Sequence, residues 1–217
     1  YGATAGVGLA WQRAEELYGA GATLGVVGLG TGTLACYKKP GQILHYFEID
    51  PLMVEIARDR KIFSFLEKCA PDTQMHLGDA RLTLSESSAK PYDLIFVDAF
   101  LGAAIPTHLL TREAIAMYFS KLGPNGIVAV HVSNRNLELA SVVAGVASAN
   151  GAVARYYRGG DVQENAHESK WVPKVVAVAR HERDFGALAA SPYWPVIDRD
   201  PGQAIWSDDY SNVLGAL

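Results

Sequence analysis

Short apolar segments that alternate with longer amphipathic segments constrain the fold of this chain more than any other feature. Most of the apolar segments are unbroken and rich in β-branched residues, which is typical of strands buried on both faces of a sheet. We predict strands at Thr23–Leu29, Ile43–Ile49, Gln74–Leu77, Tyr92–Val97, Gly126–Val132, Ala152–Tyr157 and Val175–Ala179. We predict helices at Val7–Leu17, Pro51–Asp59, Thr111–Lys121 and Leu137–Asn150. This alternation implies right-handed crossovers, so we expect an α/β fold with a mostly parallel seven-stranded sheet and helices on both faces.

Three single residues support the helix boundaries. Pro51 suits the first turn of a helix, where its missing N–H costs nothing. Thr111 precedes Arg112 and is a candidate N-cap. Gly151 suits the position just after a helix that ends near Asn150.

Composition and charge argue against several classes of protein. The 217 residues suit one domain, which we assign to residues 1–217. The formal net charge of −4 and the lack of a Lys/Arg cluster argue against a nucleic-acid partner. No apolar stretch reaches the roughly 18 residues that span a bilayer, so we expect no direct membrane insertion of this segment. We also expect no signal peptide.

The two cysteines lie far apart in the sequence. Neither Cys36 nor Cys69 has the spacing of a zinc ligand, so we expect no metal. We predict two buried or free thiols in a reducing compartment, and therefore a cytoplasmic protein.

Polar and glycine residues follow the predicted strands, and ligands of parallel α/β sheets bind beyond the carboxyl ends of the strands. Gly28, Gly30 and Gly32 lie at the end of the first predicted strand and just after it. Glycine lets the backbone turn tightly and approach a ligand, although a tight turn without a ligand would look the same. The turn is not a P-loop, because no Gly-Lys-Ser/Thr sequence follows it.

Acidic residues follow the next two strands. Glu48 lies about 20 residues after the glycine turn, where a carboxylate accepts hydrogen bonds from ribose hydroxyls. Asp50 suits either this role or an N-cap before Pro51. Asp79, followed by Ala80, suits an acceptor for an adenine amino group or a turn-forming aspartate.

Asp98 follows the fourth strand directly. A carboxylate there suits a general base or a group that holds a cationic amine, and a structural aspartate bonded to loop amides is the alternative. The apolar sequence from Ala99 to Pro106 follows and could line or cover a pocket. His131 ends the fifth strand and suits a hydrogen-bonded core histidine better than a base, and His108 faces either the site or solvent.

The C-terminal segment contains a polar cluster. Asp208, Asp209 and Tyr210 follow Trp206 and could bind an amine by charge and cation–π contact. A hydrogen-bonded cap on the core fits the same residues equally well.

These motifs together resemble a known family. The glycine turn, "FEIDP", "GDAR" and "YDLIFVDAF", in this order, resemble the class I S-adenosylmethionine-dependent methyltransferase fold, a three-layer Rossmann-like architecture. Within it, "AIPTHLLTREA", "VHVSNR" and "WSDDYSN" look most like the bacterial spermidine synthase-like (polyamine aminopropyltransferase) branch that is often fused to membrane segments. The resemblance covers the chain from about Gly6 to Leu217.

The resemblance implies a function. The activity would be transfer of an aminopropyl group from decarboxylated S-adenosylmethionine to a small amine, with release of methylthioadenosine and without a metal. The implied nucleotide-binding residues are Gly28, Gly30, Gly32, Glu48, Asp50, Asp79 and Ala80. Asp98 would be the catalytic aspartate, and Asp208, Asp209, Tyr210 and His131 are candidates for the amine site. The resemblance also allows a homodimer of this chain.

Three departures from the family pattern keep alternatives open. The Asp-x-x-Asp pattern of spermidine synthases is missing, because Ala99, Phe100 and Leu101 follow Asp98. The acid that relatives of this branch carry in the next loop is also missing, because this chain has Gly102, Ala103 and Ala104 there. The second carboxylate expected for a diamine is therefore lacking, and Asp208 with Asp209 could replace it. We expect this domain to lack the N-terminal β-domain of true spermidine synthases. A methyltransferase that uses intact S-adenosylmethionine, or a non-catalytic nucleotide-binding domain, therefore remains an alternative. Val26, where methyltransferases usually carry an acid, favours aminopropyl transfer slightly.

Overall fold

The computed structural model describes residue 8 and residues 10–11, 16–87, 91–100, 106–157 and 173–216. The helix expected at Val7–Leu17 lies largely outside the described residues, as does most of the apolar sequence between Ala99 and Pro106.

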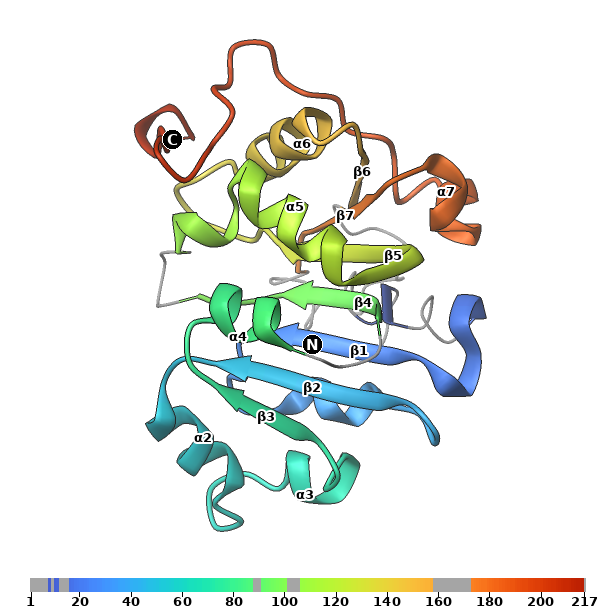
Figure 1. The fold of residues 1–217 in the computed structure, drawn as a ribbon, viewed down its shortest axis with the longest axis vertical. Coiled ribbons are helices and arrows are strands. Elements are labelled where there is room, and N and C mark those ends of the chain that lie inside the picture. Colours follow the sequence, from blue (N-terminus) through green and yellow to red (C-terminus); the bar gives the residue numbers. More distant parts are fainter. Residues whose placement is uncertain are drawn as a thin grey trace, which may run out of the picture.

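Seven strands form one sheet in the order β3-β2-β1-β4-β5-β7-β6 (Figure 1). The strands are β1 (Thr23–Val27), β2 (Ile43–Glu48), β3 (Gln74–Leu77), β4 (Tyr92–Val97), β5 (Leu122–His131), β6 (Val153–Tyr157) and β7 (Val175–Ala179). All neighbours are parallel except β7, which runs antiparallel to both β5 and β6. The mostly parallel seven-stranded sheet is therefore confirmed.

The described α-helices and 3₁₀ helices lie between the strands, before β1 and after β7. The α-helices are α2 (Pro51–Arg58), α3 (Phe65–Cys69), α4 (Ala80–Glu86), α5 (Arg112–Lys121), α6 (Leu139–Ala149) and α7 (Ala187–Ala190). The 3₁₀ helices are η1 (Gly19–Gly21), η2 (Thr33–Tyr37), η3 (Thr107–Leu109), η4 (Glu182–Phe185) and η5 (Leu214–Ala216). Within the described part of the chain, no helix is long and apolar enough to cross a bilayer.

The helix boundaries follow from local chemistry. The Thr111 hydroxyl accepts a hydrogen bond from the Ala114 N–H and caps α5, and Gly151 adopts φ +66° just after α6, so both predictions are confirmed. The Asp50 carboxylate caps α2 by accepting from the Leu52 N–H, and Pro51 occupies the first turn.

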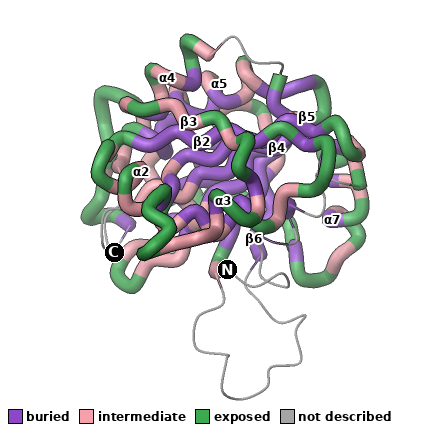
Figure 2. The backbone as a smooth tube through the Cα atoms, turned by 90° about the horizontal axis from the view of Figure 1, so that it is seen from below, coloured by how far each residue is buried: buried purple, intermediate pink, exposed green. Residues whose placement is uncertain are grey.

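The sheet separates two hydrophobic cores, which together make three layers. In β4, Ile95 and Val97 enter the core beneath α4, α5 and α6, whereas Leu94 and Phe96 enter the core beneath η2, α2, α3 and α7. This alternation follows from the two-residue period of a strand, and both sets are apolar because both faces are covered. Figure 2 shows the buried strands enclosed between more exposed outer segments.

One strand begins earlier than predicted. The sequence Gly123-Pro124-Asn125 reads as a turn, but Leu122 already pairs with Tyr92, and the register shifts before Leu94 pairs with Ile127. The exposed Pro124 and Asn125 form this irregularity, so β5 starts at Leu122 rather than Gly126.

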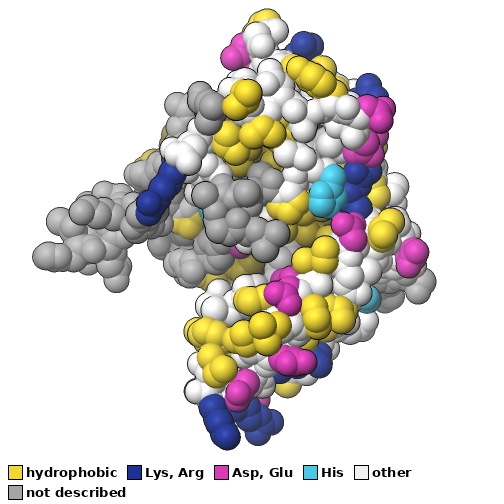
Figure 3. Space-filling model, turned by 90° about the vertical axis from the view of Figure 1, so that its left-hand side faces the viewer, with side chains coloured by type: hydrophobic (Ala, Val, Ile, Leu, Met, Phe, Trp, Pro, Cys, Tyr) yellow, Lys and Arg dark blue, Asp and Glu magenta, His cyan; other side chains and the backbone are white. Residues whose placement is uncertain are grey.

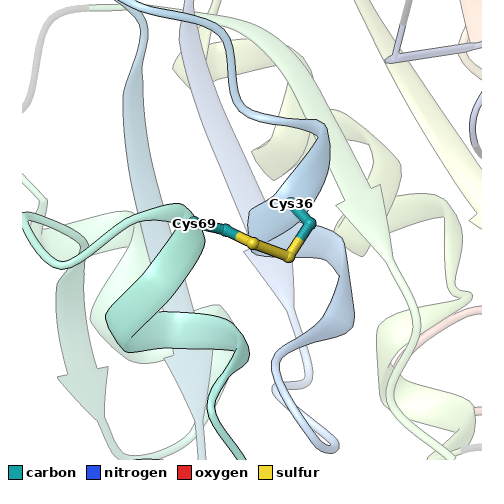
Figure 4. Close-up of a disulfide and its surroundings, with 2 residues drawn as sticks. All are labelled: Cys36 and Cys69. Carbon is teal, nitrogen blue, oxygen red and sulfur yellow. A yellow bond between two sulfur atoms is a disulfide. The ribbon is translucent and has the colours of Figure 1, made fainter.

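The prediction of two thiols is wrong. Cys36 in η2 and Cys69 in α3 form a disulfide, with their Cα atoms 4.6 Å apart (Figure 4). Their positions 33 residues apart gave no local signal, because the pairing depends on how η2 packs against α3 in the folded chain.

Candidate active site

A cavity of about 550 Å³ lies where the strand order reverses, between β1 and β4. Successive connections lead away from this point in opposite directions, which leaves a crevice at the carboxyl edge of the sheet. Its lining residues lie at or beyond the carboxyl ends of β1, β2, β3, β4 and β5. Figure 3 looks onto this edge, where acidic side chains lie among hydrophobic ones.

The three glycines of the turn after β1 have different surroundings. A Cβ on Gly28, at φ +95°, would lie 2.5 Å from the Asp98 carbonyl oxygen, so glycine lets the ends of β1 and β4 approach each other. Gly30, at φ +52°, lines the cavity and has open space where a Cβ would point. Gly32 packs against Leu66 of α3 and is not among the described lining residues.

The Glu48 carboxylate joins the ends of β1 and β2. One oxygen, Oε2, accepts from the Leu29 N–H at 2.8 Å. The other, Oε1, accepts from the N–H groups of Ile49 and Asp50 at 2.8 and 3.0 Å. The residue is 9% exposed and lines the cavity, so this buried charge is held by backbone amides. A carboxylate has about four acceptor positions, which leaves capacity for a ligand hydroxyl.

Asp79 caps the helix that follows β3. Its Oδ1 accepts from the N–H groups of Arg81 and Leu82, and its Oδ2 lies 3.2 Å from His108 Nε2. The short helix α4, which Asp79 begins, was not predicted, because seven residues give little periodicity. Asp79, Ala80 and His108 all line the cavity.

Asp98 and His131 form a close pair on the opposite side of the cavity. The distance from Asp98 Oδ1 to His131 Nδ1 is 2.6 Å, and each side chain is 14% exposed. The Phe100 ring packs edge-on against the His131 ring, with centroids 4.9 Å apart. His131 thus fixes the orientation of the Asp98 carboxylate, which follows β4 directly.

The C-terminal cluster lies against α4 and α5. Arg81 donates to both Asp208 oxygens, at 2.6 and 2.9 Å, and the Thr111 hydroxyl donates to Oδ1 at 2.7 Å. The Arg81 guanidinium lowers the pKa of the Asp208 carboxyl below its usual value. Asp209 and Tyr210 are exposed.

The structure brings most of the predicted site residues together. Those that line the cavity are Gly28, Gly30, Glu48, Asp50, Asp79, Ala80, Asp98 and His131. Those absent from its described lining are Gly32, Asp208, Asp209 and Tyr210, so an amine-binding role of the C-terminal cluster stays a prediction.

Sequence reasoning missed several lining residues. Met53 lies three residues after Asp50 on α2, and Leu109 ends η3, after the apolar sequence that follows β4. Their apolar character alone did not distinguish them from core residues. Ala99, Phe100 and Pro106 of the apolar sequence after β4 line the cavity, in agreement with the prediction. His108 was left between site and solvent, and its proximity to Asp79 gives it a place on the cavity wall.

The cavity is acidic in its described part. Four carboxylates line it, and no lysine or arginine is among its described lining residues. No three His, Cys, Asp or Glu side chains in the described chain lie close enough together to hold a metal ion.

The strand order and the structural neighbours define a Rossmann-like fold of the class I methyltransferase type. Human Methyltransferase-like protein 13, solved in complex with SAH, superposes with a TM-score of 0.60 at 23% identity, covering 81% of this chain and 79% of that chain. A probable spermidine synthase from Corynebacterium glutamicum superposes with a TM-score of 0.59 at 17% identity, covering 80% of this chain and 63% of that chain.

The chain is also similar in sequence to the polyamine aminopropyltransferase of Vibrio vulnificus, with 33% identity over 108 residues. The alignment covers 48% of this chain and 35% of that relative, about a third of its length. No family model matches the chain. The predicted resemblance to spermidine synthases within the class I methyltransferase fold is thereby confirmed.

Proposed function

We propose that this domain transfers an aminopropyl group from decarboxylated S-adenosylmethionine to a small amine and releases methylthioadenosine. The observation that carries the proposal is the Asp98 carboxylate, which His131 holds at the cavity wall directly after β4. The sequence similarity to a polyamine aminopropyltransferase supports the same reaction class.

The charge of the cavity favours the decarboxylated donor. Intact S-adenosylmethionine carries a carboxylate, which would enter a cavity lined by Glu48, Asp50, Asp79 and Asp98. Removal of that carboxylate leaves the sulfonium and the ammonium, so the donor is more cationic and the acidic lining attracts it more strongly.

The donor's adenosine part fits the half of the cavity formed after β1, β2 and β3. The remaining acceptor capacity of Glu48 suits a ribose hydroxyl, and Asp79 with Ala80 suits the adenine ring. Gly30 leaves open space beside the ribose and sulfonium. This arrangement directs the reacting methylene toward Asp98, at the neighbouring strand end.

The chemistry needs alignment and an unprotonated amine. Asp98 accepts a hydrogen bond from the attacking amine and receives its proton, while His131 keeps the carboxylate in place. The new N–C bond forms as the C–S bond breaks, and the sulfur retains the electron pair. The proton passes from Asp98 to solvent. Positioning supplies most of the remaining rate enhancement, because the sulfonium is already an activated leaving group.

The test combines turnover and binding. Asp98→Asn should lower methylthioadenosine release by about 10²-fold or more, whereas methylthioadenosine affinity measured by calorimetry should stay within about threefold. Undiminished turnover of this variant would refute the role of Asp98. The wild-type protein should bind decarboxylated S-adenosylmethionine more tightly than the intact form. Tighter binding of the intact form, with methyl transfer to an acceptor, would replace the proposal with a methyltransferase.

A further inference from the structure

We infer that Asp208 is a positioning residue for the adenosine part of the donor and that it acts through Arg81 and His108. The inference rests on the proposed function, which places adenosine in the half of the cavity beside Asp79. Asp208 is not among the described lining residues of the cavity. It belongs to the C-terminal segment, residues 206–210, which is hydrogen-bonded to α4 and α5.

The series of contacts begins at the cavity wall. His108 in η3 and Asp79 at the start of α4 both line the cavity, and His108 Nε2 lies 3.2 Å from Asp79 Oδ2. The other oxygen of Asp79, Oδ1, accepts from the N–H groups of Arg81 and Leu82 within α4. The partner of Oδ2 therefore comes from a different segment of the chain. The orientation of this carboxylate toward adenine thus depends on where η3 lies.

The Arg81 guanidinium joins η3 to the C-terminal segment. Its Nη1 group donates to the His108 carbonyl oxygen at 3.2 Å and to Asp208 Oδ1 at 2.6 Å. Its Nη2 group donates to Asp208 Oδ2 at 2.9 Å. A carboxylate that accepts from both nitrogens fixes the plane of the guanidinium, because the two hydrogen bonds are parallel. Asp208 therefore keeps Nη1 directed at the carbonyl group of η3.

Helix α5 holds Asp208 in its own place. The Thr111 hydroxyl, at the 1% exposed N-cap of α5, donates to Asp208 Oδ1 at 2.7 Å. The Asp208 N–H donates to Glu113 Oε2 at 3.1 Å. The Arg112 N–H donates to the carbonyl oxygen of the buried Trp206 at 2.9 Å. Because these partners lie on a helix that packs against the core, the position of Asp208 is well defined.

The physical consequence is that Asp208 supports donor affinity from outside the cavity. An asparagine keeps the shape of the side chain but has one acceptor oxygen, so it cannot accept from both guanidinium nitrogens of Arg81. The guanidinium then loses its fixed orientation, and its hydrogen bond to the His108 carbonyl weakens. A direct contact of Asp208 with the amine would instead leave donor affinity unchanged, so a binding measurement separates the two roles.

The experiment measures methylthioadenosine affinity by calorimetry. Asp208→Asn should raise the Kd about fivefold. The matched control Asp72→Asn removes the ion pair of an exposed aspartate with Lys38 and should leave the Kd unchanged. A small loss of stability does not change the Kd, because nearly all of the protein stays folded. An unchanged Kd for Asp208→Asn, or an equal rise in the control, would overturn the inference and leave the proposed function standing. Failure of the wild-type protein to bind methylthioadenosine would overturn both.

A double-variant cycle tests the path through His108. His108→Ala should weaken methylthioadenosine binding, and adding Asp208→Asn to it should change the Kd by less than about twofold. Arg81→Lys keeps the charge but lacks the planar fork, so it should raise the Kd by about the same factor as Asp208→Asn. Unchanged affinity of either single variant, or losses that multiply in the double variant, would overturn the inference.

Discussion

Removal of the Cys36–Cys69 disulfide should destabilise the domain substantially. The bond closes a loop between residues 33 positions apart, which contains β2 and α2. In the chain-entropy description, a loop of this length restricts the unfolded chain enough to stabilise the fold by about 4 kcal/mol. For a domain of this size, that corresponds to a fall in Tm of roughly 8–15 °C.

The assay is urea unfolding of the wild type and of the double variant Cys36→Ser, Cys69→Ser, each with and without dithiothreitol. The wild type should lose about 4 kcal/mol of unfolding free energy on reduction and should then match the double variant. Dithiothreitol should leave the double variant unchanged. A loss below about 1 kcal/mol in the wild type, or an equal response of the double variant, would refute the reasoning.

Three further predictions concern single side chains. His45 is 4% exposed, and its burial, reinforced by the charge of the neighbouring His76, lowers the pKa of its imidazole to about 4. Because the folded state resists protonation of this ring, the free energy of unfolding should fall by about 3 kcal/mol as the pH drops from about 6.5 to 4. Urea unfolding of His45→Asn should show a flatter pH dependence. Asp208→Asn removes the ion pair with Arg81, which contributes about 1 kcal/mol, and should lower Tm by a few degrees. Asp209→Asn, the control, should leave Tm unchanged. Equal Tm values for the two variants in scanning calorimetry would contradict a stabilising ion pair. Glu48→Gln should weaken methylthioadenosine binding at least about tenfold in calorimetry, with the exposed Glu55→Gln as control, and unchanged affinity would argue against a ribose contact.

The sheet could be predicted from sequence because burial on both faces makes each strand a continuous apolar segment. All seven strands were located, and β3, β4 and β7 match the prediction at both ends. The short helices α3, α4 and α7 were missed, because four to seven residues carry too little periodicity to distinguish a helix from a loop. The strand ends then located most of the cavity lining, since parallel strands bring their carboxyl ends to one edge.

The sequence by itself determined the layered fold and the residues that end each strand, because both depend on local composition and on the two-residue period of a strand. Only the tertiary structure decided which of those residues pair with one another. The Asp98–His131 contact, the Arg81–Asp208 ion pair and the Cys36–Cys69 bond each join segments separated by more than 30 residues. Such pairings depend on how the elements pack, and packing distances are not encoded in any local pattern of residues.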